Sequence, residues 1–127
     1  MNHIEIEATE NSPKIILNAT EGVINISGDS YPENTFEFYK VVLAWLHDYF
    51  KSPLNTTTIH LNLSYFNSST VQILFEIFDI LHEHREKTTL VIQWYYDKAD
   101  SDWRDDYEYF SEEFNALNIH PIGEERY

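Results

Sequence analysis

Three hydroxyl residues follow an asparagine where a strand pattern gives way to a helix pattern, in the run Asn67-Ser68-Ser69-Thr70. Residues 59–64 alternate between apolar and polar, as in a half-buried strand, and the apolar residues after the run recur at helical spacing. Ser69 and Gln72 have the spacing of a capping box, which predicts Ser69 as the N-cap and leaves the Ser68 hydroxyl free. Two interpretations stay open: the hydroxyls only cap the helix, as Ser and Thr commonly do, or one of them accepts a phosphate.

A phosphate on the free Ser68 hydroxyl would be favoured at a helix start. The N–H groups exposed there and the positive end of the helix dipole both attract anions. The phosphate would add about −1.5 to −2 elementary charges at neutral pH. The second interpretation therefore makes the run a switch that changes the charge of one surface.

The helix predicted after the hydroxyl run, to about residue 87, carries more apolar residues than one stripe requires. We expect Val71 and Phe75 to be exposed beside the run and available to another protein. The alternative is a helix buried on two sides, either in a compact domain or in a homodimer. The apolar residues are Val71, Ile73, Leu74, Phe75, Ile77, Phe78, Ile80 and Leu81.

Other candidates for chemistry are weaker. The two histidines of His82-Glu83-His84 lack the four-residue spacing with which one helix face binds a metal, and the chain has no cysteine. We interpret this segment as a solvated helix end. The acid pairs at residues 105–106 and 112–113 lie opposite the apolar stripe of their helix, without a pocket to shift their pKa values. We therefore expect no metal, no cofactor and no enzymatic activity.

Charge limits the class of partner. The formal net charge is −14, from 22 acidic and 8 basic residues. This argues against binding to nucleic acid or to an anionic membrane, because both need Lys and Arg to neutralise phosphates. It permits a basic protein partner, although solubility alone also accounts for it. The apolar runs are too short to insert into a membrane, and nothing near the start indicates export. Together with the absence of cysteine this fits the cytoplasm.

The order of elements predicts an α/β fold with 1–127 as one domain. The sheet should be a single mixed layer, mostly parallel, with an N-terminal hairpin and about three helices. Strands are predicted at residues 14–18, 23–27, 59–64, 88–96 and, as a short edge strand, 118–122. Helices are predicted at residues 35–51, 69–87 and 103–117. If the strands ending at Ser27, Ser64 and Tyr96 are parallel, the loops 28–34, 65–69 and 97–101 meet at one sheet edge, where α/β proteins bind ligands and partners.

Three motifs resemble those of the SiaC-type regulatory phosphoproteins: GDSYPEN at residues 28–34, LSYFNSST at 63–70 and WYYD at 94–97. The resemblance extends over nearly the whole chain in length and order. It implies a fold similar to SpoIIAA, the STAS class of anti-sigma-factor antagonists, and a non-enzymatic protein. It places the phosphoacceptor at Ser68, with Ser69 and Thr70 as alternates. Asn67 stands where classical antagonists have Asp, which weighs against direct control of a sigma factor.

The resemblance also implies the partners. A Ser/Thr protein kinase of the anti-sigma-factor type would phosphorylate the chain, and a PP2C-like phosphatase would reverse the reaction. The unphosphorylated form would bind and regulate a diguanylate cyclase, in cyclic di-GMP signalling and biofilm formation. The alternative is a constitutive interaction or scaffold module, or an anti-sigma-factor antagonist without this switch. The expected partner-binding residues are Asp29, Ser30, Tyr31, Pro32, Glu33, Asn34, Asn67, Val71 and Phe75.

Overall fold

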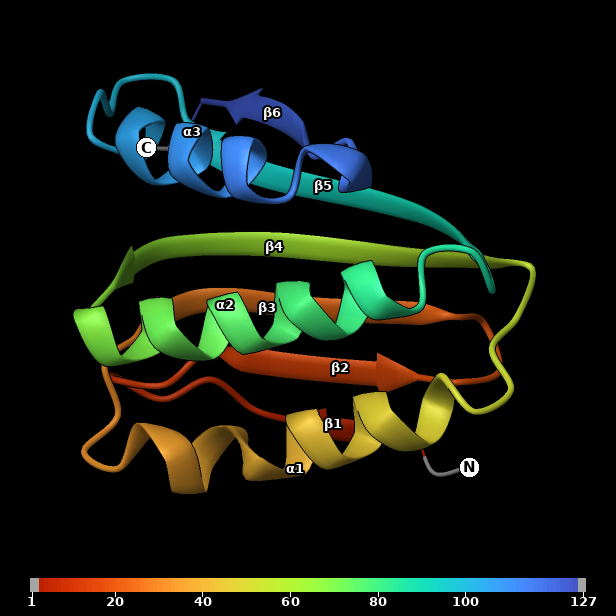
Figure 1. Cartoon of the computed structure of the whole chain (residues 1–127). Helices are drawn as coiled ribbons and strands as arrows, with labels where there is room; N and C mark the ends of the chain where they lie inside the picture. Colours follow the sequence, from red (N-terminus) through yellow and green to blue (C-terminus); the bar gives the residue numbers. More distant parts are fainter. Residues whose placement is uncertain (1–2, 126–127) are drawn as a thin grey trace.

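The computed structural model describes residues 3–125, which form a six-stranded sheet and three α-helices (Figure 1). The elements in chain order are β1 Ile4–Ile6, β2 Lys14–Asn18, β3 Val23–Ser30, α1 Thr35–Tyr49, β4 Thr56–Phe66, α2 Ser68–Glu83, β5 Thr89–Asp97, α3 Trp103–Glu113, a 3-10 turn at Asn115–Leu117, and β6 His120–Glu124.

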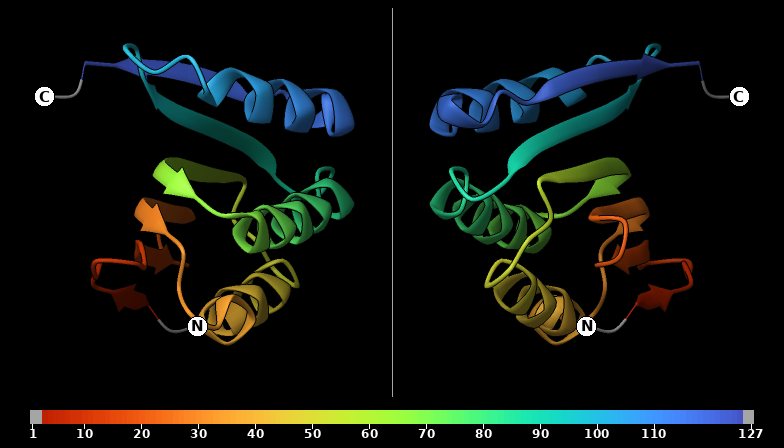
Figure 2. Two further views of the ribbon diagram at one scale, coloured as in Figure 1. Left: turned by 90° about the vertical axis from the view of Figure 1, so that its left-hand side faces the viewer. Right: turned by 90° about the vertical axis from the view of Figure 1, so that its right-hand side faces the viewer.

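The strands lie across the sheet in chain order, from β1 to β6. The pairs β1–β2 and β2–β3 are antiparallel, whereas β3, β4, β5 and β6 run parallel to one another. Parallel neighbours need crossover connections, and α1, α2 and α3 provide them. Figure 2 shows all three helices on the same face of the sheet. The predicted α/β class, the N-terminal hairpin and the mixed, mostly parallel sheet are confirmed.

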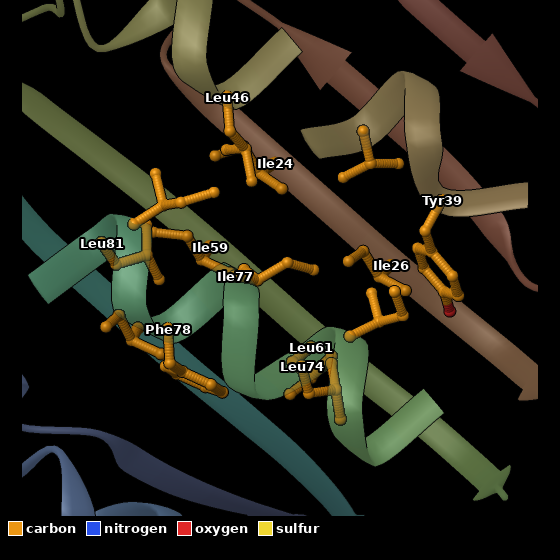
Figure 3. Packing of buried hydrophobic residues seen from close by; sticks show 14 of the residues in the cluster. Ile24, Ile26, Tyr39, Leu46, Ile59, Leu61, Leu74, Ile77, Phe78 and Leu81 are labelled. Atoms are coloured by element: carbon orange, nitrogen blue, oxygen red, sulfur yellow. The ribbon is translucent and has the colours of Figure 1, made fainter. Parts of the chain in front are cut away.

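The core fills the space between the sheet and the helices (Figure 3). Along β4, Ile59 and Leu61 are buried and His60 between them is half-buried, because side chains alternate between the faces of a strand. Along α2, Leu74, Ile77 and Phe78 share one face at spacings of three and four. The Phe78 ring lies 5.2 Å from that of Phe110 in α3, so α2 is held by the sheet and by α3 together.

The predicted boundaries differ from the structure at several points. The first strand, β1, was not predicted, because only Ile4 and Ile6 carry its pattern and it depends on pairing with β2. β3 continues through Ser30 after a register shift between Gly28 and Asp29, so the first three residues of the expected loop belong to a strand. α2 ends at Glu83, before residue 87. α3 ends at Glu113 and gives way to the 3-10 turn, whose last residue is followed by the left-handed Asn118.

Candidate functional site

The hydroxyl run forms the turn between β4 and the start of α2. Asn67 is the N-cap, and its side-chain oxygen accepts a hydrogen bond from the Thr70 N–H at 2.9 Å. The prediction that Ser69 caps the helix is therefore wrong. Asparagine is among the best N-cap residues, and its extended backbone continues directly from β4. Ser68 and Ser69 become the first two helical residues, and both side chains are exposed.

Thr70 differs from the two serines because it is fully buried. Its hydroxyl donates to the Ser30 carbonyl at 3.0 Å and lies 2.9 Å from the Ser30 hydroxyl. The Ser30 hydroxyl lies 2.7 Å from that of Tyr39 in α1. Since the Thr70 proton is used on the carbonyl, Ser30 donates to Thr70 and Tyr39 donates to Ser30. We call Ser30, Tyr39 and Thr70 the buried hydroxyl network.

The buried hydroxyl network joins three elements beneath the turn. The Asn67 N–H also donates to the Ser30 carbonyl, at 3.1 Å. The end of β3 therefore holds both the N-cap and the third helical residue of α2, while Tyr39 connects them to α1. Burial raises the pKa of Tyr39 to about 12. Tyr39 therefore keeps its proton at neutral pH, as the direction of the hydrogen bonds requires.

The GDSYPEN segment supplies one neighbour of the turn and two structural residues. Tyr31 is 38% exposed, and its ring meets that of Tyr65, which is 56% exposed, edge to face at 5.6 Å. Ser30 is fully buried and so cannot touch a partner in this conformation; it supports the turn from below. Asn34 caps α1, with its side-chain oxygen accepting from the Glu37 N–H at 3.2 Å.

The remaining predicted residues divide between surface and core. Glu33 is exposed, whereas Pro32 and Asp29 are half-buried. Val71 and Phe75 are half-buried too, and the Phe75 ring packs 5.1 Å from Phe114. The expectation that both are freely exposed is therefore wrong. The open alternative, a helix buried on two sides, describes Phe75, because α3 covers the second side of α2.

Two residues near the turn were missed by sequence reasoning. Tyr39 follows the helical stripe of α1 and gave no sign that its hydroxyl has a role. Tyr65 lies in the LSYFNSST motif, but its pairing with Tyr31 depends on the register of β3 and β4, in which Asp29 is opposite Tyr65. That register confirms that the ends of parallel strands bring the two motifs to one sheet edge.

The His82-Glu83-His84 segment is also less solvated than expected. The His84 ring stacks on Phe50 at 5.0 Å, and its pKa is lowered by desolvation first and by Lys87 second. Residues 3–125 contain no group of three or more His, Cys, Asp or Glu side chains placed to hold one metal ion. Within the same range, no helix has the length and apolar content needed to cross a bilayer.

The chain belongs to the SiaC family of regulatory phosphoproteins, whose family model matches residues 6–123. An uncharacterised protein of Pseudomonas aeruginosa is 29% identical over 99 residues, which cover 77% of this chain and 79% of that protein.

Solved structures of SiaC have a fold similar to that of this chain. The crystal structure of apo-SiaC from P. aeruginosa is 25% identical, with a TM-score of 0.74 over 98% of this chain and 99% of that one. SiaC in the crystal structure of the diguanylate cyclase SiaD with its activator SiaC is also 25% identical, with a TM-score of 0.83 over 97% of this chain and 99% of that one.

The buried hydroxyl network can be tested by removing one of its hydroxyls. Thr70→Val should lower the free energy of unfolding by about 1–2 kcal/mol, because a buried hydrogen-bonded group loses its partner. The matched control is Ser69→Ala, which removes an exposed hydroxyl from the same helical turn and should change stability by less than about 0.5 kcal/mol. Urea unfolding measures both. Equal effects of the two variants would contradict the network.

The protonation of Tyr39 can be tested by alkaline titration. Its pKa is about 12 in the folded protein against 10.0 for a free tyrosine. A raised pKa means that the fold favours the protonated form, so this contribution to stability is complete below pH 10.0 and is lost as the pH rises toward 12. The wild type should therefore lose stability relative to Tyr39→Phe across that interval. A constant difference between the two unfolding free energies would show that Tyr39 titrates normally.

Proposed function

We propose that this protein is a non-enzymatic regulator, controlled by phosphorylation of Ser68, whose unphosphorylated form binds and regulates a diguanylate cyclase. The observation that carries the proposal is the exposure of Ser68 at the start of α2, three residues after Tyr65, whose exposed ring contacts that of Tyr31. Two findings support it. The chain belongs to a family of regulatory phosphoproteins, and SiaC of P. aeruginosa, a structural neighbour, is the activator of the cyclase SiaD in their crystal structure.

Accessibility separates the three candidate acceptors. The Thr70 hydroxyl is buried and bonded, so a kinase could reach it only after the turn opens. Ser68 and Ser69 are both exposed. We favour Ser68, since it directly follows the asparagine, as in the family motif that this chain resembles.

A phosphate at Ser68 would find hydrogen-bond donors in place. The first intrahelical bond of α2 runs from the Val71 N–H to the Asn67 carbonyl, and the Thr70 N–H is used by the Asn67 side chain. The N–H groups of Ser68 and Ser69 precede that first bond, so they can donate to the phosphate. The modified turn would keep its shape while its charge changes.

The charge change would then control docking. The unphosphorylated surface at Ser68 combines exposed aromatic rings with small hydroxyls, which suits contact with a protein. Phosphate adds about two negative charges to a protein whose net charge is already −14. Removing the phosphate from water in an interface also costs free energy. We propose that a Ser/Thr kinase of the anti-sigma-factor type adds the phosphate and that a PP2C-like phosphatase removes it. Both reactions would take place in the cytoplasm, on residues 1–127 acting as one STAS-like domain.

The second candidate function is a constitutive interaction module. The Tyr31–Tyr65 pair favours it, because these rings are exposed whether or not Ser68 is modified. On this alternative a negative charge at Ser68 would leave partner affinity unchanged.

The two functions differ in the response to charge at Ser68. Ser68→Asp should weaken binding to the diguanylate cyclase by about tenfold or more, since an uncompensated charge enters the interface. Ser68→Ala should bind as the wild type does and should block modification by the kinase. Isothermal titration calorimetry measures the affinities, with Glu76→Gln on the exposed face of α2 as a variant of changed charge outside the turn.

Mass spectrometry after incubation with the cognate kinase locates the phosphate. The proposal predicts phosphate at Ser68. Phosphate at Ser69 alone would make the acceptor assignment wrong while retaining the switch, and its absence from residues 68–70 would overturn the switch itself.

A further inference from the structure

The sheet divides at the edge that carries the Ser68 turn. β4 and β5 are paired from Thr56 opposite Thr89 to Leu61 opposite Trp94, and the pairing then ends. Beyond that point β4 remains paired with β3 through Phe66, while β5 remains paired with β6 through Asp97. Figure 1 shows the two strands diverging toward the carboxyl end of β4.

A cleft of about 260 Å³ lies between the diverging strands. Aromatic rings form much of its wall. Tyr65 and Phe66 come from β4, Tyr96 from β5 and Trp103 from the start of α3. The Tyr96 and Trp103 rings are stacked, with centroids 3.7 Å apart and planes 13° from parallel. This stack holds both rings in place, and the Arg104 guanidinium carbon lies 5.9 Å from the Trp103 ring centroid, so a guanidinium of the chain itself already lies over one ring at the cleft.

Four aspartates also line the cleft, and among residues 3–125 no lysine or arginine lines it. Asp97 and Asp100 each accept one backbone N–H, from Ala99 at 3.0 Å and from Asp102 at 2.8 Å. Asp102 makes no side-chain capping bond to α3. None of the ion pairs found among residues 3–125 involves an aspartate of the cleft.

Asp106 also lines the cleft and is half-buried. Its pKa is raised, by burial first and by the neighbouring Asp105 second, so burial and a like charge both disfavour its ionised form. The helix dipole favours acids in the first turn of α3. That effect applies equally to Asp105, which does not line the cleft, so it does not account for the half-buried carboxylate of Asp106 in the cleft.

We propose that this cleft binds an arginine side chain of the protein partner. A guanidinium group is planar, stacks on aromatic faces and forms paired hydrogen bonds with carboxylates. An ammonium group fits less well, because it is more strongly hydrated and cannot stack. The inference rests on the proposed function for the existence of a protein partner at this face. Tyr65 and Phe66 line the cleft and immediately precede Asn67 and Ser68, so both sites belong to one surface.

Binding of arginine in the cleft can be tested without the partner protein. The probe is N-acetyl-arginine amide, and the matched probe is N-acetyl-citrulline amide, which has nearly the same shape without the charge. Both are titrated into the ¹⁵N-labelled full-length protein and followed by NMR. The arginine probe should shift the Trp103 indole signal and the backbone signals of residues 65–66 and 96–106 in a saturable way, and the citrulline probe should not.

Two variants decide whether the cleft carboxylate is responsible. Asp106→Asn should weaken binding of the arginine probe by about fivefold, the effect of losing one favourable ion pair. Asp105→Asn removes the same charge from the same helical turn outside the cleft and should weaken it less than twofold by the same reasoning. Equal responses to arginine and citrulline, shifts centred elsewhere, or equal effects of the two variants would overturn the inference.

The outcome is independent of the switch. No kinase or cyclase enters the probe titration, so an absence of phosphate at Ser68 would leave an arginine-binding cleft in place. Conversely, an empty cleft would leave the affinity difference between Ser68→Asp and Ser68→Ala intact.

Discussion

The carbonyl oxygen of Ser30 fixes the site, because two hydrogen bonds to it determine where α2 begins. It accepts from the Asn67 N–H at 3.1 Å and from the Thr70 hydroxyl at 3.0 Å. A buried carbonyl with two partners is costly to release, since each donor would have to find another acceptor away from water. The end of β3 therefore sets the position of the turn. The hydrogen bonds from Asn67 and Thr70 hold the segment that contains the two exposed serines.

These hydrogen bonds to the Ser30 carbonyl explain why three adjacent hydroxyls have different roles. Thr70 points inward and completes the buried hydroxyl network, while Ser68 and Ser69 face solvent. A cap and a modification site can coexist in four residues because separate residues perform the two tasks. Asn67 and Thr70 hold the helix start, and Ser68 is left available for chemistry.

Sequence patterns predicted the architecture because the face of each strand or helix that meets the core must be apolar. The period-two alternation of β4 and the spacing of three and four in α2 follow from which face meets the core, and both are visible in the chain. The ends of elements were less predictable. Asn67 and Ser69 are both good N-cap residues, and the choice between them depends on the Ser30 carbonyl, almost forty residues earlier. Phe75 was misplaced for the same reason, since only the packing of α3 against α2 shows what covers it.

The candidate site was predictable in outline and not in its contacts. Parallel strands had to bring the GDSYPEN and LSYFNSST motifs to one edge, and they do. Neither the Tyr31–Tyr65 pair nor the cleft between β4 and β5 could be predicted, because both depend on strand register and on where a ladder ends. Those features give the surface its chemistry: exposed aromatic rings at the turn, and a cleft lined by aromatic and aspartate side chains beside it.

The central claim is that phosphate on Ser68 separates the protein from a diguanylate cyclase. The most direct measurement is the dissociation constant of that complex with the protein fully phosphorylated by its kinase, and again after phosphatase treatment of the same sample. The account predicts that phosphorylation weakens the complex by about tenfold or more and that dephosphorylation restores it. An unchanged dissociation constant, with the phosphate located on Ser68, would contradict the account.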